Sequence, residues 1–224
     1  DRWSFVATWS RSMRLPTLND LWYTDPVHKH GDNLQPEYAH SFEAIAKYQT
    51  SHVEAHLSYF LMKGSNLIDW VKFDPTETAF TSHNIAELTN QGLEAGLALR
   101  LGEYLPFLGD AGRLSLDYLY MTQQHRAPGV AMSKYALNYL RHKFTAQLAH
   151  NVGSRIEALW ALRYQDRVNQ ASPFATLDLK LDYRLTNHLR AGLELNNITD
   201  TQYADIAGVP QPGFWLSGSI SYSL

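Results

Sequence analysis

The sequence predicts an all-β fold, a transmembrane antiparallel up-and-down β-barrel. Most of the chain alternates apolar and polar residues with a period of two, which is typical of strands with one apolar face. Short turns alternate with longer loops, as in barrels of the bacterial outer membrane. The last residues, 214–224, form a closing strand with small hydroxyl groups opposite an apolar face of Phe214, Leu216, Ile220, Tyr222 and Leu224.

Ten strands are expected, and they fill one domain, residues 1–224. They cover about residues 2–13, 37–49, 53–72, 80–101, 113–124, 135–149, 156–164, 175–185, 189–195 and 214–224. The first strands carry apolar faces of Trp3, Phe5, Ala7 and Trp9, then Phe42, Ala44, Ala46 and Tyr48, then Val53, Ala55, Leu57, Tyr59 and Leu61, then Leu93, Ala95, Leu97 and Leu99. Charged residues such as Glu43 and Lys47 occupy the positions between them.

The later strands repeat this pattern. Their apolar faces are Leu114, Leu116, Tyr118 and Tyr120, then Phe144, Ala146 and Leu148, then Ile156, Ala158, Trp160, Leu162 and Tyr164, then Ala175 to Leu185 at every second residue, then Leu189, Ala191, Leu193 and Leu195. Short turns are expected at 50–51, 151–153 and 186–188, and longer loops at 14–36, 125–134, 167–173 and 197–213. An even number of strands with short periplasmic turns places the C-terminus in the periplasm.

Composition supports the membrane interpretation. The longest purely apolar run, Ala158–Leu162, is far shorter than the roughly 20 residues that a spanning helix needs. The 13 Tyr and 6 Trp residues suit aromatic girdles at the membrane interfaces. A net charge of -3 gives no basic bias toward nucleic acid, and the absence of cysteine excludes disulfides and Cys-based metal sites.

A soluble β-sandwich or propeller is the alternative fold. Such a fold buries its apolar face under a second layer, whereas here every strand keeps charged or polar residues on its other face. We therefore favour the membrane barrel. The chain opens directly into a strand and carries no signal peptide, so we expect it to belong to a longer protein.

No catalytic motif is present, and we expect neither an enzyme nor a bound metal or cofactor. His28 and His30 invite a metal interpretation, but histidines in an exposed loop are more often ordinary surface groups. Large loop aromatics provide contact area for a bulky ligand at low entropic cost. The expected extracellular ligand-binding residues are these aromatics and nearby cations: Trp22, Tyr23, Trp70, Lys72, Arg126, Arg167 and Tyr203. The aromatics could equally pack between loops, and the cations could pair with loop carboxylates or lipopolysaccharide.

Several stretches resemble TonB-dependent outer-membrane transporters. Arg11, Arg14 and Pro16–Tyr23, followed by Gly31–Glu37, are similar to a segment in the second half of their barrel. Leu195–Asp200, Tyr203 and the Pro212-Gly213 pair before the closing strand resemble their C-terminal signature. Three stretches look most like the vitamin B12 (cobalamin) branch of the family: Ile68–Val71, Tyr139–Lys143 and Val209–Leu216.

The resemblance implies a 22-stranded barrel with an N-terminal plug, of which this chain would supply about the last ten strands and no plug. It implies uptake of cobalamin or a related corrinoid, driven by TonB acting on the missing N-terminal part. A surface lipoprotein that captures cobalamin would be a further partner, and outer-membrane lipid and lipopolysaccharide would surround the barrel. The residues of the closing strand named above would serve as the barrel-insertion signal, although the chain ends in leucine where that signal usually has an aromatic residue.

Other functions stay open. Within the same family, the alternative is a siderophore or haem transporter. From other classes, the alternatives are an outer-membrane enzyme barrel of the protease or phospholipase kind, which needs a Ser/His or Asp/His pair at the rim, and a passive porin.

Overall fold

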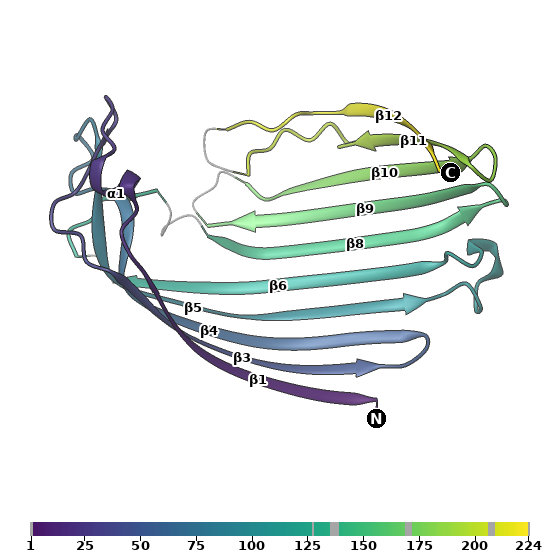
Figure 1. The fold of residues 1–224 in the computed structure, drawn as a ribbon, viewed down its shortest axis with the longest axis horizontal. Helices are drawn as coiled ribbons and strands as arrows, with labels where there is room; N and C mark the ends of the chain where they lie inside the picture. Colours follow the sequence, from purple (N-terminus) through teal and green to yellow (C-terminus); the bar gives the residue numbers. More distant parts are fainter. Residues whose placement is uncertain (1, 127, 135–138, 169–171, 206–208, 224) are drawn as a thin grey trace.

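A computed structural model describes residues 2–126, 128–134, 139–168, 172–205 and 209–223, whose strands form one curved sheet that is antiparallel except at one short strand (Figure 1). Ten strands follow one another in the order of the chain, each hydrogen-bonded to the strand before and after it. Their bounds are β1 (Trp3–Arg14), β3 (Glu37–Gln49), β4 (Val53–Lys72), β5 (Phe80–Arg100), β6 (Arg113–Arg126), β8 (Leu140–Val152), β9 (Ile156–Arg167), β10 (Phe174–Arg184), β11 (Leu189–Asn196) and β12 (Trp215–Tyr222). The predicted all-β meander is confirmed.

Short elements occupy three of the connections. Helix α1 (Leu18–Trp22) and strand β2 (His28–Lys29) lie in the segment expected as a loop, strand β7 (Met132–Ser133) lies before β8, and the 3-10 helix η1 (Pro106–Leu108) lies before β6. The described part of the sixth expected strand begins at Leu140, and positions 135–138 of that expectation lie outside the described residues. No described helix is long and apolar enough to cross a membrane.

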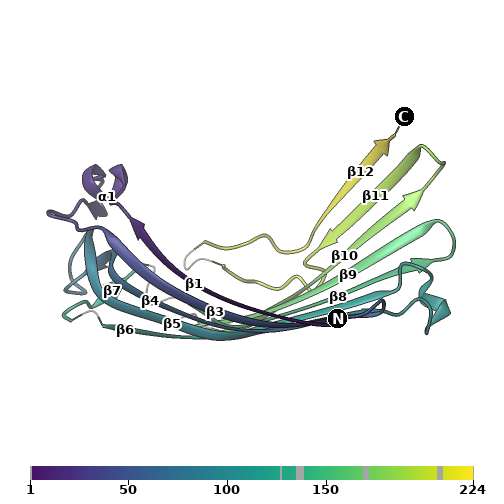
Figure 2. The same cartoon turned by 60° about the horizontal axis from the view of Figure 1, so that its bottom comes forward.

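Figures 1 and 2 show a trough whose two ends differ. The start of β1, the end of β12 and the turns β3–β4, β8–β9 and β10–β11 lie at one end. The β5–β6 connection, which contains η1, lies at the same end. The segment with α1 and the ends of the long strands β4 and β5 lie at the opposite end, which we call the loop end.

The strand register keeps apolar residues on one face and polar residues on the other. Tyr118 of β6 pairs with Ala95 of β5 and with Phe144 of β8, whereas the preceding Asp117 pairs with Gly96 and Thr145. Partners in a ladder point to the same side of the sheet, so the alternation in each strand adds up to a continuous apolar face and a continuous polar face.

The apolar face is exposed across the trough, without a second layer among the described elements. Large exposed residues on it include Phe5, Trp9, Leu57, Leu93, Tyr118, Leu193, Leu216 and Ile220. An uncovered apolar surface of this extent needs a non-aqueous neighbour. Several buried side chains lie instead toward the loop end of the β4–β5 hairpin: Ile68, Trp70, Val71, Ile85 and Leu88. Ile85 and Leu88 form a small core with Met62 and Leu67 of the same hairpin.

A pair of adjacent substitutions distinguishes the two faces. Leu93→Arg puts a charge on the apolar face and should destabilise the folded barrel in lipid by about 2–4 kcal/mol. Glu94→Arg, on the polar face, should leave stability nearly unchanged. Urea unfolding of the protein in lipid vesicles measures both, and equal effects of the two substitutions would contradict a lipid-facing apolar surface.

Candidate ligand-binding site

At the loop end, the β4–β5 hairpin continues beyond its neighbours. Its register is the same on both sides of Asn66, from Val53↔Leu99 to Ser65↔Glu87 and from Leu67↔Ile85 to Val71↔Thr81, although β3 and β6 have already ended. Two short strands replace them. Val71 pairs with Ser133 of β7, and Phe80 pairs with His28 of β2, so the local strand order is β7–β4–β5–β2. Segments from two connections, β1–β3 and β6–β8, therefore meet around one hairpin.

An aromatic cluster, formed by Tyr23, His28, Trp70 and Phe80, lies at this junction. The His28 ring is 5.1 Å from Trp70, 5.9 Å from Tyr23 and 6.4 Å from Phe80 between ring centroids. Tyr23 meets Trp70 edge to face at 6.3 Å. Trp70 is only 9% exposed, whereas Tyr23 is 45% exposed. Trp70 thus forms the base of the cluster, and Tyr23 offers the surface that a ligand could contact.

Asp25 places a carboxylate against two members of the aromatic cluster, Tyr23 and His28. Its carboxylate accepts hydrogen bonds from the Tyr23 hydroxyl at 2.9 Å, from the Val27 N–H at 2.7 Å and from His28 Nδ1 at 2.9 Å. The bond from His28, assisted by those from Val27 and Tyr23, lowers the pKa of Asp25 to about 2. The hydrogen bond to Asp25 raises the pKa of Tyr23. The other ring nitrogen of His28, Nε2, contacts the Lys134 ammonium.

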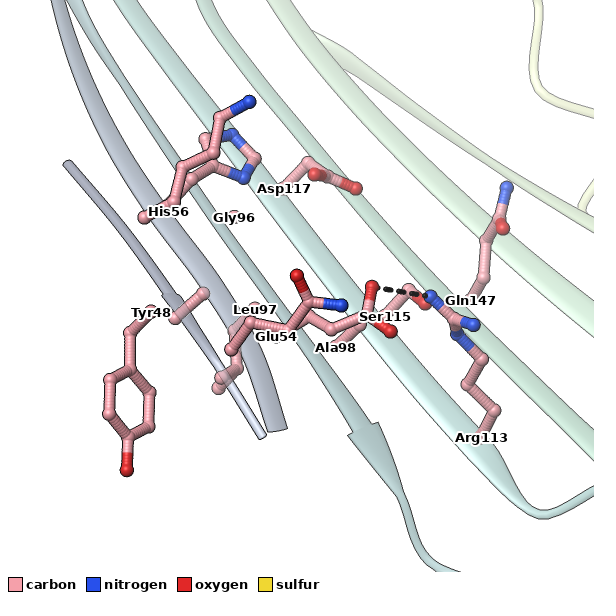
Figure 3. A pocket seen from close by; sticks show the side chains of 13 residues that line it. Tyr48, Glu54, His56, Gly96, Leu97, Ala98, Arg113, Ser115, Asp117 and Gln147 are labelled. Atoms are coloured by element: carbon pink, nitrogen blue, oxygen red, sulfur yellow. Dashed lines mark hydrogen bonds and ion pairs between the residues drawn. The ribbon is translucent and has the colours of Figure 1, made fainter. Parts of the chain in front are cut away.

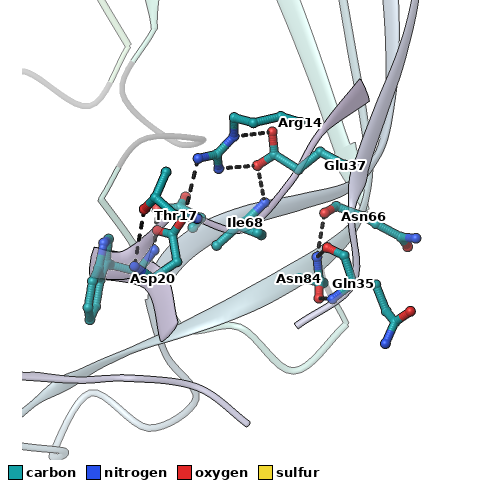
Figure 4. Close-up of polar contacts among 10 residues, drawn as sticks. Arg14, Thr17, Asp20, Gln35, Glu37, Asn66, Ile68 and Asn84 are labelled. Atoms are coloured by element: carbon teal, nitrogen blue, oxygen red, sulfur yellow. Dashed lines mark hydrogen bonds and ion pairs between the residues drawn. The ribbon is translucent and has the colours of Figure 1, made fainter. Parts of the chain in front are cut away.

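A first polar anchor, Arg14, Asp20 and Glu37, holds the segment that carries α1 (Figure 4). Arg14 donates to both oxygens of Glu37, at 2.7 and 2.5 Å, and to Asp20 Oδ2 at 3.2 Å. Glu37 also accepts the Ile68 N–H at 2.7 Å. Thr17 and Asp20 cap the helix reciprocally, with Thr17 Oγ1 accepting the Asp20 N–H. β1, α1, β3 and β4 are therefore tied at one point.

The following segment is fixed to β5. The Gly31 N–H donates to Ser82 Oγ at 2.7 Å, and this hydroxyl donates to the Asp20 carbonyl at 2.7 Å. A Cβ on Gly31 would lie 1.8 Å from the Ser82 carbonyl oxygen, so the close approach requires glycine. Asn84 accepts the Gln35 N–H at 2.8 Å and donates to its carbonyl at 3.0 Å. Gly31 and Gln35, which lie in the segment that resembles the receptor family, thus hold the backbone of this connection against β5.

A second polar anchor holds the connection before β12. The Asn197 N–H donates to Asp178 Oδ1 at 2.7 Å, and its side chain donates to the Thr201 carbonyl at 2.9 Å. Asp200 Oδ1 accepts the Phe214 N–H at 2.8 Å. Asn197 and Asp200 both have positive φ, of 50° and 49°, which asparagine and aspartate tolerate better than most residues. These bonds fix both ends of the connection.

Tyr203 belongs to this second anchor. Its ring stacks on Phe174 at 4.5 Å, and its hydroxyl accepts a hydrogen bond from Arg163 at 3.1 Å. The Arg163 guanidinium lies 5.3 Å from the Tyr203 ring centroid and 5.7 Å from that of Phe174. A packed and hydrogen-bonded ring of this kind favours the loop-packing alternative for Tyr203 over direct contact with a ligand.

The polar face contains a hollow of about 430 Å³ between β3 and β8 (Figure 3). Lys47, Glu54, His56, Arg113, Asp117 and Gln147 are among its lining residues. A second hollow of about 290 Å³ shares His56 and Asp117 with it. The absence of a side chain at Gly96 leaves room for the His56 ring, because a Cβ at position 96 would lie 2.1 Å from His56 Cε1. The polar face of the sheet is therefore hollowed here and lined largely by charged and polar side chains.

The structure divides the expected ligand-binding residues into groups. Tyr23, Trp70 and Lys72 come together at the hairpin end, and Trp22, 73% exposed, lies beside them on α1 with its ring 6.3 Å from His30. Arg126 and Arg167 end β6 and β9, and no ion pair involves either of them within the described ranges. Phe214, Leu216, Ile220 and Tyr222 are exposed at the β12 edge, and Leu224 lies outside the described residues.

Sequence reasoning missed Asp25, Phe80 and Lys134 at this site. Lys134 is 106 residues from His28 along the chain, and only the pairing of β7 with β4 brings them together. His28 could be singled out from the sequence, because it lies in the expected loop 14–36 together with Trp22 and Tyr23. The described part of the chain has no group of three or more His, Asp or Glu side chains arranged to hold a metal ion.

The fold and the motif anchors identify the class of protein. Residues 1–198 match the family model described as TonB dependent receptor-like, beta-barrel, and the chain belongs to this family. Proteins of this family are β-barrels of the outer membrane. The described residues form a part of such a barrel, an open sheet in which ten strands follow one another and β2 and β7 pair at its side.

Individual relatives are distant. The chain is 23% identical over 202 residues to the vitamin B12 transporter BtuB of Vibrio vulnificus (strain YJ016), covering 89% of this chain and 30% of that protein. The copper transporter OprC superimposes with a TM-score of 0.74 at 15% identity, over 98% of this chain and 37% of its own. A ferric enterobactin receptor of Pseudomonas aeruginosa gives 0.73 at 20% identity, over 99% and 38%. The chain spans about a third of the length of these relatives.

Loss of the Glu37 carboxylate should release the first anchor. Glu37→Gln replaces charge-assisted hydrogen bonds to Arg14 and should lower the free energy of local opening by about 2 kcal/mol. Hydrogen exchange of the Ile68 amide reports this opening, because that amide donates to Glu37. Glu43→Gln on the same strand is the control, since Glu43 bonds Ser58 instead. Unchanged Ile68 protection in Glu37→Gln would contradict the anchor.

Acid should loosen the aromatic cluster through Asp25. Its lowered pKa means that its stabilising contribution is present above the unfolded-state value near 4 and is lost as the pH falls toward about 2. Protection of the Val27 amide, corrected for intrinsic exchange, should therefore fall between about pH 4 and pH 2. Asp25→Asn should abolish this pH dependence, and a variant that retains it would assign the effect to another group.

Proposed function

We propose that the protein takes up cobalamin or a related corrinoid across the bacterial outer membrane by TonB-dependent active transport. The assignment to TonB-dependent transport rests on the match of residues 1–198 to the family model of the receptor barrel. The corrinoid part is supported by the similarity to a vitamin B12 transporter over 89% of the chain and by the resemblance of Ile68–Val71, Tyr139–Lys143 and Val209–Leu216 to that branch.

The described residues suit each step of this activity. The ligand docks at the loop end, where Trp22 and Tyr23 offer exposed aromatic surface beside Lys72. The two polar anchors hold the surrounding connections, so little ordering is required on binding. TonB, energised by the proton-motive force, acts on the part of the protein outside this chain and opens a path along the polar face. No bond is made or broken, so the protein is a transporter and not an enzyme.

The same proposal assigns the remaining surfaces. The apolar face contacts lipid and lipopolysaccharide, and the short-turn end, with the C-terminus, lies in the periplasm. Phe214, Leu216, Ile220, Tyr222 and Leu224 form the insertion signal. A cobalamin-capturing surface lipoprotein would contact the loop end.

One feature of the site argues against His28 as a haem ligand or a catalytic residue. A haem ligand or a catalytic histidine needs a free ring nitrogen, but both nitrogens of His28 are engaged, by Asp25 and by Lys134. A siderophore transporter remains the second candidate, because a site of aromatic and cationic side chains also suits such ligands. Passive conductance in planar bilayers would indicate the porin alternative.

Uptake in cells tests the proposal. Cells that lack their own corrinoid transporter and express the protein from its complete gene should accumulate radiolabelled cyanocobalamin. Collapse of the proton-motive force should stop accumulation and leave surface binding intact. Binding of a ferric siderophore without any binding of cobalamin would replace the corrinoid assignment with the second candidate.

Substitutions on α1 test the docking surface. Trp22→Ala removes an aromatic contact and should weaken cobalamin binding about tenfold. Leu18→Ala, equally exposed on the same helix, should have little effect. Equilibrium binding to whole cells measures both, and identical affinities of the two variants would remove Trp22 from the site. Unchanged affinity in Trp70→Ala would likewise remove Trp70 from the site. Tyr203→Ala should have little direct effect on binding, because its ring packs on Phe174.

A further inference from the structure

Two lysines converge on one aromatic ring at the loop end. The Lys72 ammonium lies 4.7 Å from the Phe80 ring centroid, and the Lys134 ammonium lies 5.2 Å from the same centroid. The two charges are therefore at most about 10 Å apart. Lys134 also donates to His28 Nε2, which fixes the position of its ammonium group. Both side chains are half-buried.

No carboxylate contacts either lysine directly within the described ranges, and the Asp25 carboxylate is connected to Lys134 only through the His28 ring between them. Neither Lys72 nor Lys134 forms an ion pair there, although Lys180 and the arginines 14, 141 and 163 do. The nearby Asp25 is engaged by Tyr23, Val27 and His28, and Asp74 by Thr76. Two half-buried like charges beside aromatic rings repel each other more strongly than in water. An anion between them would remove this cost.

The register decides which source of anions this pair can reach. Ser82 pairs with Trp70, so Phe80 and Lys72 share their face of the hairpin, and Lys134 joins it by pairing with Trp70 through β7. The register is the same on both sides of Asn66, from Val71↔Thr81 to His56↔Gly96, so this face continues the polar face of the sheet. Phosphates of the surrounding lipid lie beside the apolar face instead. The anion is therefore carried by a soluble ligand that enters from the loop end.

We propose that Lys72 and Lys134 bind a phosphate or carboxylate group of the transported ligand, with Phe80 as the floor of the site and His28 holding Lys134 in place. The inference rests on the proposed function for the identity of that ligand. Cobalamin carries one such group, the phosphodiester of its nucleotide loop. In that case the corrin ring would lie toward Tyr23 and Trp22, and the nucleotide loop toward the two lysines.

Comparison of two corrinoids tests this assignment. Cobinamide has the corrin ring but no nucleotide loop, so it lacks the phosphodiester. With the complete protein, Lys72→Ala and Lys134→Met should each weaken cobalamin binding about tenfold and change cobinamide binding less than twofold. Lys72→Arg should retain most of the affinity. Lys29→Ala is the matched control, because Lys29 is exposed on β2 and makes no ion pair or ring contact in the described part of the structure.

The outcomes separate this inference from the proposed function. Equal losses for both corrinoids, or no loss for either, would overturn the anion site while leaving corrinoid transport intact. If the unaltered protein binds neither corrinoid, the proposed function fails, and inorganic phosphate then serves as the probe. Its phosphorus NMR line should broaden with the unaltered protein and with Lys29→Ala, and should stay sharp with the Lys72→Ala, Lys134→Met double variant. Absence of broadening, or equal broadening in the double variant, would overturn the site.

Discussion

Backbone hydrogen bonding is the constraint on which the rest of this structure depends. A strand that crosses hydrocarbon must satisfy every N–H and C=O group within the protein, because lipid offers no partner. Within the sheet, the chain meets this requirement by pairing each strand with its sequence neighbour, as in the twelve-residue ladder between β1 and β3. The outer edges of β1 and β12 pair with no other strand among the described residues. Once the ladders are fixed, alternation alone decides which side chains meet lipid and which meet the lumen.

The connections at the loop end meet the same requirement with side chains. Glu37 and Asn84, at strand positions, bind backbone groups of neighbouring segments with their side chains, and Asn197 and Asp200 bind backbone groups before β12. Glu37, Asn197 and Asp200 lie in the stretches that resemble the receptor family, and their contacts give a physical reason for the resemblance. They hold connections in place and leave the exposed surface between them free to differ in ligand preference.

Strand order and the two faces could be predicted because they follow from local patterns and short turns. The bounds expected for β4, 53–72, agree with those found, Val53–Lys72. The composition of the ligand site could be predicted only in part. Tyr23, Trp70 and Lys72 stand out as large or charged loop residues, whereas Lys134 and Phe80 have no local signal, and the packed role of Tyr203 depends on Phe174 and Arg163.

The amino-acid sequence by itself determined the class of fold, the facing of each strand and the family, because a period of two is a property of neighbouring residues. Only the tertiary structure decided that β2 and β7 replace β6 and β3 at the end of the long hairpin. Pairings between residues far apart in the chain depend on how connections cross one another in space. The two lysines are 62 positions apart in the sequence, and they share a ring because these two short strands pair with the hairpin.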